Sequence, residues 1–239
     1  MQKRQPEFLE VLDAAAMLQE ILPEAVLVGG TAAAIHAEHR LSHDADHILN
    51  DLRDNFDEIL GRLESIAGWK TARIQRPVQI LGSLDGIETG IRQLIRAAPL
   101  ETMTIPFREH QTITLPTQEE MLRIKGVLIL KRNATRDYLD FVAVAGHMGD
   151  DRTCNALVSF DTLYPQASGQ SALQQLQVQL SHPQPYDLEN NDLGEYRSIS
   201  AEWQGWDNVK KACEKIAMLS FDHVAQPRKP SPGTPDLVL

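Results

Sequence analysis

The sequence predicts an α+β protein in which a small mixed β-sheet flanked by helices is followed by a helical half. Short strand signals cluster between residues 70 and 115, helical periodicity precedes them, and the pattern becomes wholly helical after Pro116. We place the α/β part at residues 1–116 and the helical half at residues 117–225. Residues 226–239 contain four prolines and few large apolar side chains, which predicts a disordered tail.

The elements of the α/β part follow from periodicity and from turn residues. Apolar residues at three- and four-residue steps predict a helix over 7–22, which Pro23 ends. A buried strand is expected over 25–28, a helix from Thr31 to about His39, a strand over 44–49 and a helix over 55–69. Further strands are expected over 71–74, 78–81, 89–95, 103–107 and 111–115, punctuated by turn signals such as Asp85-Gly86.

The helical half opens with a capping signal. Thr117 is followed by Glu120 three residues later, the spacing of a capping box. Helices are then expected over 118–132, 135–148, 151–163, 170–181 and 199–224, the last with an apolar stripe typical of a core helix.

Composition restricts the class of protein. Apolar residues make up 42% of the 239-residue chain and charged residues 23%, a balance typical of globular proteins. The two cysteines have no Cys/His cluster around them, which argues against a zinc site and a disulfide scaffold and favours the cytoplasm. No apolar run reaches 18 residues and the N-terminus lacks the pattern of a secretion signal, so we expect no membrane partner.

Charge is spread unevenly along the chain. Residues 70–136 carry 11 Lys/Arg against 6 Asp/Glu, a local charge of +5, which leaves −15 for the rest of a chain whose net charge is −10. A basic segment in an acidic protein is either a surface that faces phosphates or a random scatter over a solvated face. Charge alone favours scatter.

The most specific motif joins two glycines to two aspartates. Gly29-Gly30-Thr31 lies between a predicted strand and a predicted helix, where backbone amides and the helix dipole favour an anion. Asp44 and Asp46 are two residues apart on the next predicted strand, so both carboxylates project from one face. Such a pair suits Mg²⁺, which binds one or two carboxylates together with substrate phosphates. Taken singly, a Gly-Gly pair is most often only a turn and an Asp-x-Asp only surface, but their combination predicts a metal–nucleotide site.

A second candidate cluster lies in the helical half. Lys125 sits in an apolar helix, where a lysine must pair, extend to the surface or meet a ligand such as a triphosphate. Asp137 and Asp140 share a face of the next helix, and one of them is expected to pair with Lys125 or Arg132. A purely structural ion pair between helices is the alternative reading.

These motifs resemble a known family. Gly29-Gly30-Thr31, Arg40 and Ser42-x-Asp44-x-Asp46 look like the signature of polymerase-β-type nucleotidyltransferases. The block of Lys125, Arg132 and Arg136-Asp137-x-x-Asp140 is similar to a later motif of the AbiEii toxin family, the toxin half of type IV toxin–antitoxin systems. The two blocks cover about 50 residues in matching order.

The resemblance implies a nucleotidyltransferase that uses Mg²⁺ and an NTP to nucleotidylate an acceptor hydroxyl, which is tRNA for some relatives, and it implies a cognate antitoxin as partner. Asp44 and Asp46 would hold the metal, and Asp44, Asp46, Lys125 and Asp140 would be catalytic. The nucleotide-binding set would be Gly29, Gly30, Thr31, Arg40, Ser42, Lys125, Arg132, Arg136 and Asp137.

One element of the pattern stays open. Polymerase-β-type sites usually carry a third carboxylate on a later strand, and Asp85, Glu88 and Glu101 are the candidates. If Gln93 takes that position instead, the chain has none, and Asp140 would be the base.

Two other functions remain. One is a pseudoenzyme of the same fold that binds a nucleotide or a protein without catalysis. The other is a nucleotidyltransferase that acts on a small molecule or a protein. Four histidines near the motif, His36, His39, His43 and His47, lack a metal-binding spacing and are interpreted as structural, with His47 buried.

Overall fold

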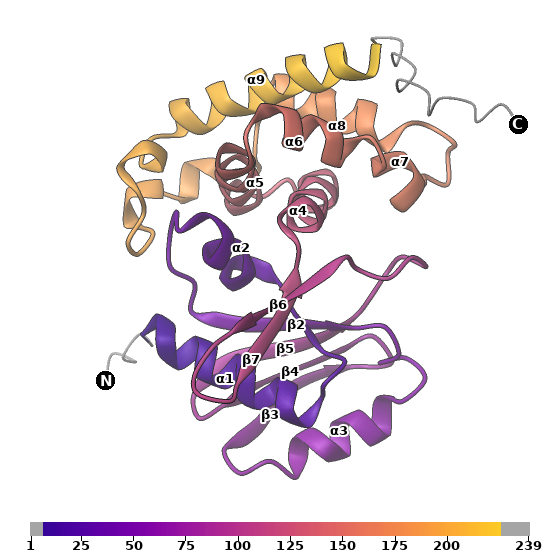
Figure 1. Ribbon diagram of the computed structural model, residues 1–239, viewed down its shortest axis with the longest axis vertical. Helices are drawn as coiled ribbons and strands as arrows, with labels where there is room; N and C mark the ends of the chain where they lie inside the picture. Colours follow the sequence, from indigo (N-terminus) through magenta and orange to yellow (C-terminus); the bar gives the residue numbers. More distant parts are fainter. Residues whose placement is uncertain (1–6, 226–239) are drawn as a thin grey trace, which may run out of the picture.

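The computed structural model describes residues 7–225, so the predicted tail lies outside the described residues. Figure 1 shows the sheet in the lower part of the molecule, with α1 crossing the view at the height of the strands, α3 at the bottom and a layer of helices above. The α/β part contains α1 (Phe8–Ile21), α2 (Gly29–Ala37), α3 (Phe56–Glu64) and seven strands. The helical part contains α4 (Gln118–Arg132), α5 (Thr135–Met148), α6 (Asp150–Leu157), α7 (Phe160–Leu163), α8 (Ala172–Ser181), the 3₁₀ turns η1 (Leu188–Asn190), η2 (Leu193–Glu195) and η3 (Ala201–Trp203), and α9 (Trp206–Ala225).

Five strands form a mixed sheet. They are β1 (Val26–Leu27), β2 (Asp44–Leu49), β3 (Trp69–Gln75), β4 (Gln79–Leu84) and β5 (Ile87–Gln93), in the order β1-β2-β5-β4-β3. Only β2 and β5 are parallel, and the other neighbours are antiparallel. The strands β6 (Thr102–Pro106) and β7 (Thr112–Pro116) form a separate hairpin. The predicted small mixed sheet is therefore present.

The Asp85-Gly86 signal forms the turn between β4 and β5. Leu84 pairs with Ile87, and both turn residues have positive φ, 49° at Asp85 and 88° at Gly86. This is the two-residue hairpin geometry that an Asp-Gly pair favours. The turn fixes the register of β5 against β4, and through it the register across the sheet.

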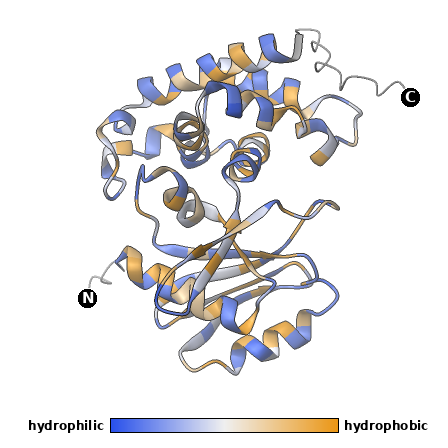
Figure 2. Cartoon of the chain, in the orientation of Figure 1, coloured by the Kyte–Doolittle hydropathy of each residue, from blue (hydrophilic) through white to orange (hydrophobic). Residues whose placement is uncertain are grey.

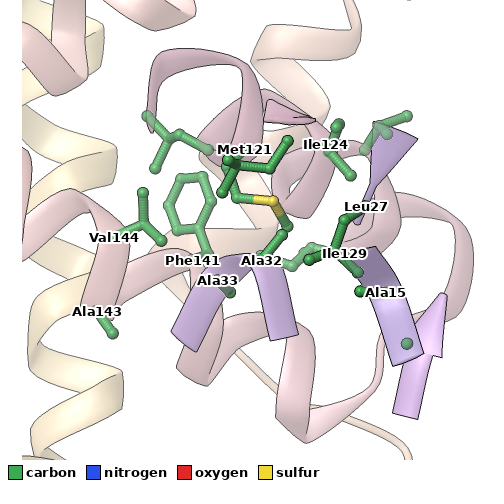
Figure 3. Close-up of a cluster of buried hydrophobic side chains, with 14 of the residues drawn as sticks. Ala15, Leu27, Ala32, Ala33, Met121, Ile124, Ile129, Phe141, Ala143 and Val144 are labelled. Carbon is green, nitrogen blue, oxygen red and sulfur yellow. The ribbon is translucent and has the colours of Figure 1, made fainter. Parts of the chain in front are cut away.

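A shared apolar core joins the two parts of the chain. Small side chains of α2, among them Ala32 and Ala33, let this helix approach Met121 of α4 and Phe141 of α5, as Figure 3 shows. All four residues are fully buried. Figure 2 shows hydrophobic and hydrophilic segments alternating along the helices, as amphipathic packing requires. Helix α2 therefore connects the sheet to the helical half.

Several predicted boundaries differ from the structure. The helix expected over 151–163 is divided into α6 and α7, and the helix expected over 199–224 begins only at Trp206, after the short turn η3. Gly205 precedes α9, and glycine is a poor helix former. Thr117 caps α4 by accepting from the amide of Glu120, but the Glu120 carboxylate pairs with Arg96 and Arg123, so only half of the capping box forms.

Across residues 7–225 no helix combines the length and the apolar character needed to cross a bilayer.

Candidate active site

A cavity of about 1360 Å³ lies where the sheet meets the helical half. Its walls come from the start of α2, from β2 and β5, from α4 and α5, and from the segment around η1 and η2. It gathers most of the predicted site residues: Gly29, Gly30, Arg40, Ser42, Asp44, Asp46, Lys125, Arg132 and Arg136. Residues almost 110 positions apart in the sequence therefore share one cavity.

The glycine turn brings a helix N-terminus to the cavity. The Val28 amide donates to the Asp46 carbonyl at 2.8 Å, which ties the turn to β2. Gly29 has a φ of +75° and begins α2, and its missing Cβ would lie 3.5 Å from the Cβ of Asp46. The first amides of a helix have no partner within the helix, so Gly29 and Gly30 present donors beside the aspartates.

Gly30 is required by its neighbours. A Cβ at this position would lie 2.6 Å from Nη2 of Arg40 and 2.8 Å from Oγ of Ser42. Both side chains are buried, so neither can swing freely into solvent. The glycine therefore lets a guanidinium group and a hydroxyl group approach the turn closely.

Asp44 and Asp46 lie on one face of β2, as predicted. Burial alternates along the strand, with Ala45, His47 and Leu49 buried and the aspartates partly exposed toward the cavity. The Ser42 hydroxyl donates to Oδ1 of Asp44 at 2.6 Å. The Thr31 hydroxyl donates to the Asp44 carbonyl at 2.5 Å. Thr31 is fully buried and does not line the cavity, so its hydroxyl holds β2 and is not placed to contact a nucleotide.

The electrostatics of the aspartate pair fit a divalent cation. Burial raises the pKa of Asp46, the neighbouring Asp44 raises it further, and Arg92, Arg136 and Arg132 oppose the shift. Two carboxylates close enough to repel each other are stabilised by a cation with hard-oxygen preference. The residues present therefore fit Mg²⁺ held by two side chains and by substrate phosphates. Within residues 7–225, no group of three or more His, Cys, Asp or Glu side chains is arranged to hold a metal ion by itself.

Asp140 lies outside the cavity, in a buried cluster of charges. It is fully buried and accepts from Nε2 of His39 at 2.7 Å and from Nε of Arg40 at 2.8 Å, and Nζ of Lys125 lies 2.6 Å from its second oxygen. Burial alone would raise the pKa of Asp140, but Arg40 and Lys125 hold it well below the ordinary value of 3.8. A carboxylate in this position has no access to an acceptor hydroxyl. The geometry does not fit the expected role of Asp140 as base, and it makes Asp140 a positioning residue for Arg40.

Asp137 connects the two remaining cations. Its carboxylate accepts from Nη2 of Arg132 at 2.8 Å and from Nζ of Lys125 at 3.3 Å, so the predicted pairing is present with both partners. Asp137 is fully buried and does not line the cavity, whereas the exposed parts of Arg132 and Arg136 do. Asp137 therefore orients cations toward the cavity without facing a ligand itself.

Strand register distinguishes the third-carboxylate candidates. Glu88 is the partner of Asp44 in the parallel β2–β5 ladder, and its exposed side chain lines the cavity. Asp85 lies in the β4–β5 turn at the cavity rim, and Glu101 pairs with Arg123 away from the cavity. Gln93 lies at the far end of β5, where its amide binds the backbone of Asn50 and Arg53. Of the four, Glu88 is nearest in register to the aspartate pair.

Three of the four histidines near the motif make structural hydrogen bonds, whereas His43 lines the cavity. His36 contacts the Pro116 carbonyl at 2.7 Å, His39 binds Asp140, and His47 contacts the Ala45 carbonyl at 2.9 Å. Complete burial lowers the pKa of His47 to about 4, so this ring is neutral near pH 7. The prediction that His47 is buried is confirmed.

One wall of the cavity comes from residues that no sequence motif indicates. Tyr186, Tyr196 and Arg197 line it from the irregular segment between α8 and α9. The Leu41 amide donates to the Arg197 carbonyl and the Ser200 amide to the His39 carbonyl, both at 2.9 Å. The guanidinium of Arg40 lies 5.4 Å from the Tyr196 ring centroid. No local motif marks this segment, because backbone pairing to residues 39–41 places it.

Comparison with solved structures shows the fold. A crystal structure from H. pylori of a protein provisionally assigned as a nucleotidyltransferase superposes with a TM-score of 0.57 and 13% identity, covering 94% of this chain and 98% of that one. The solution structure of the antibiotic-resistance factor ANT(2'')-Ia matches 64% of this chain and 91% of its own, with 9% identity and a TM-score of 0.47. The chain thus has the α+β fold of polymerase-β-type nucleotidyltransferases, which confirms the predicted fold class, whereas membership of the AbiEii family stays a prediction.

Sequence comparison finds a shorter similarity. No family model matches the chain. It is 32% identical over 130 residues to the heme uptake protein MmpL11 of Mycobacterium tuberculosis, and 30% identical over 129 residues to the mycolic acid-containing lipids exporter MmpL11 of Mycolicibacterium smegmatis. Each match covers 53% of this chain, and the chain spans only 13% of the length of these relatives. A match that covers so little of these relatives does not show that this chain shares their activities.

The close approach at Gly30 leads to a stability prediction. We expect Gly30→Ala to destabilise the protein by about 1–3 kcal/mol, because the added methyl group overpacks against Arg40 and Ser42. Gly61→Ala is the matched control: nothing lies within 4 Å of its Cβ position in α3, so it should be neutral or stabilise by up to about 1 kcal/mol. Urea unfolding measures both, and equal stabilities would contradict the packing argument.

The buried carboxylate leads to a prediction for pH. We expect Asp140→Asn to cost about 3–5 kcal/mol at pH 7, because Arg40 and Lys125 lose their buried counter-charge. The folded-state pKa of Asp140 is lowered, so its stabilisation is complete above the unfolded value of 3.8 and is lost as pH falls below it. The difference in the free energy of unfolding between wild type and variant should therefore shrink below about pH 4. Unfolding curves across pH test this against the exposed Asp222→Asn, and a pH-independent difference would refute it.

Proposed function

We propose that the protein is a Mg²⁺-dependent nucleotidyltransferase that moves an NMP from an NTP to an acceptor hydroxyl. The observation that carries the proposal is the shared cavity in which Asp44 and Asp46 lie beside the glycine-initiated N-terminus of α2 and face Arg132 and Arg136. A carboxylate pair, open helix amides and arginines are the groups that a metal-bound triphosphate needs.

The roles of the residues follow from their positions. Asp44 and Asp46 would hold Mg²⁺, which when bound supplies charge stabilisation at the phosphate oxygens. The amides of Gly29 and Gly30 bind the triphosphate from one side, and Lys125, Arg132 and Arg136 neutralise it from the other. The acceptor hydroxyl attacks the α-phosphate, the bond to the β-phosphate breaks and pyrophosphate leaves.

Glu88 is our proposed base. Its side chain lines the cavity beside Asp44 in the strand register, and a carboxylate here can accept the proton of the attacking hydroxyl. Asp140, which the sequence alone suggested as the base, is enclosed by His39, Arg40 and Lys125. Glu88 thus takes the role in this proposal, and Asp140 fixes Arg40.

The acceptor and the biological role are further parts of the proposal. Resemblance to AbiEii toxins supports tRNA as acceptor, a toxic activity and a cognate antitoxin. The cavity volume of about 1360 Å³ exceeds the 300–1,000 Å³ of ordinary small-molecule sites, which leaves room for the end of an acceptor beside the nucleotide. Incubation with labelled NTPs and total RNA tests the acceptor, and growth on expression tests toxicity.

Removal of either metal-binding carboxylate should abolish transfer. We expect Asp44→Asn and Asp46→Asn each to lower the rate at least about 10³-fold, because the remaining carboxylate cannot hold the cation correctly. Asp54→Asn, an exposed change just beyond β2, is the control and should retain full activity. The measurement is label transfer from an α-labelled NTP, alongside Mg²⁺-dependent NTP binding by calorimetry. Wild-type NTP binding without any transfer would instead indicate a pseudoenzyme.

Substitution of Glu88 should lower the catalytic rate more than the affinity for NTP. We expect Glu88→Gln to lower kcat by about 10²–10⁴-fold, with NTP affinity unchanged. Glu101→Gln is the matched control, because Glu101 pairs with Arg123 outside the cavity. Equal rates for the two variants would exclude Glu88 as the base.

A further inference from the structure

The cavity opens onto a face of the sheet that continues away from the metal-binding pair. Cross-strand partners point to the same side of a sheet, so the register defines this face. One row runs from Asp46 through Gly90 and Leu81 to Arg73. Flanking rows run from Asp44 through Glu88 and Ser83 to Lys70, and from Ile48 through Arg92 and Gln79 to Gln75. We call the part formed by β5, β4 and β3 the outer sheet face.

The two sides of this part of the sheet differ. The opposite side is buried against α1 and α3, with Trp69, Ile80, Leu84 and Ile91 in the core. On the outer sheet face, Glu88 and Arg92 are exposed, Lys70, Arg73 and Gln75 are also exposed, and the β4 residues between them are partly exposed. Figure 1 shows β3 and β4 at the side of the sheet away from the helical half.

The outer sheet face is basic on an acidic protein. It carries Lys70, Arg73 and Arg92, with Glu88 as its acidic member beside the aspartates, whereas the chain as a whole has a net charge of −10. Within residues 7–225, neither Lys70 nor Arg73 has an ion-pair partner. Arg92 lies against the side-chain amide of Gln79, and its charge acts on Asp46. Positive charge therefore leads outward from the cavity.

We propose that the outer sheet face binds the phosphodiester backbone of a single-stranded nucleic acid whose terminal hydroxyl enters the cavity as the acceptor. This inference rests on the proposed function and deepens it. Three strand spacings separate β2 from β3, about 14 Å, which a few nucleotides span. Lys70 and Arg73 contact phosphates at the far strand, and Arg92 contacts the strand where it reaches the cavity.

The chemistry of the face favours a nucleic acid over a protein partner. Its apolar members are Leu81 and Ile48, too few for the buried apolar and aromatic centre typical of a protein interface. The face has no aromatic side chain on which bases could stack, so the backbone is what it recognises. Polar Gln75, Gln79 and Ser83 supply further hydrogen bonds. Binding is accordingly independent of sequence along this face.

Removal of two charges tests the surface. The full chain carrying Lys70→Ala and Arg73→Ala is compared with one carrying Lys131→Ala and Lys211→Ala, two exposed lysines of α4 and α9 that have no ion-pair partner within residues 7–225. Fluorescence anisotropy measures binding of single strands of about ten nucleotides, RNA and DNA, from low to physiological salt. Calorimetry measures Mg²⁺·NTP binding in the same samples.

The expected result is a loss of at least about tenfold in strand affinity for the sheet-face variant alone. Its plot of log K against log salt should flatten by about 1.4, because each phosphate contact to a single strand contributes about 0.7. Equal affinities and salt slopes for the two variants would refute the proposed nucleic-acid-binding surface. So would the absence of single-strand binding by the wild type. Unchanged NTP binding in that case leaves the proposed function standing, whereas loss of NTP binding in the wild type would refute the proposed function itself.

Discussion

The ion cluster around Asp140 is the interaction on which the site depends. This one carboxylate on α5 binds Arg40 and His39, which precede β2, and Lys125, which belongs to α4. All four side chains are buried, so the cluster forms only when the two parts of the chain are docked. It costs desolvation of several charges, and such a cost is offset only when every partner is present.

The cluster also sets the geometry of the glycine turn. Because Asp140 holds Arg40 with two hydrogen bonds, the guanidinium group occupies the space beside Gly30, and Ser42 fills the remainder while it binds Asp44. The aspartate pair and the helix N-terminus are thus held at a fixed separation by a residue 94 positions away in sequence from Asp46. The desolvation cost of the buried charge cluster is thus accompanied by a cavity whose polar groups are already held in place.

The sequence predicts the glycine–aspartate motif and the pairing of Asp137, but not all of the side chains that surround the motif. The alternation of β2 and the Gly-Gly signal are local, so the shared face of Asp44 and Asp46 could be predicted from the sequence. Glu88 could not be singled out, because its position beside Asp44 depends on the register of two parallel strands separated by 38 residues. The sequence leaves Asp140 among the candidate bases, because a sequence pattern does not tell whether a carboxylate is open to the cavity or enclosed by cations. The segment that carries Tyr186 and Tyr196 has no periodicity to detect, since backbone pairing with residues 39–41 positions it.

The cations between residues 70 and 136 lie in distinct environments. Arg96 and Arg123 bind the buried Glu120, and Arg76 and Arg108 pair with Asp57 and Asp13 on the surface. Arg132 and Arg136 face the cavity. Once these structural pairs are set aside, the cations that remain on the sheet are Lys70, Arg73 and Arg92, which share one face with the aspartate pair. If the proposed function holds, these cations attract a polyanion to the strands beside the aspartate pair, and their positive field opposes the negative field of the rest of the acidic surface.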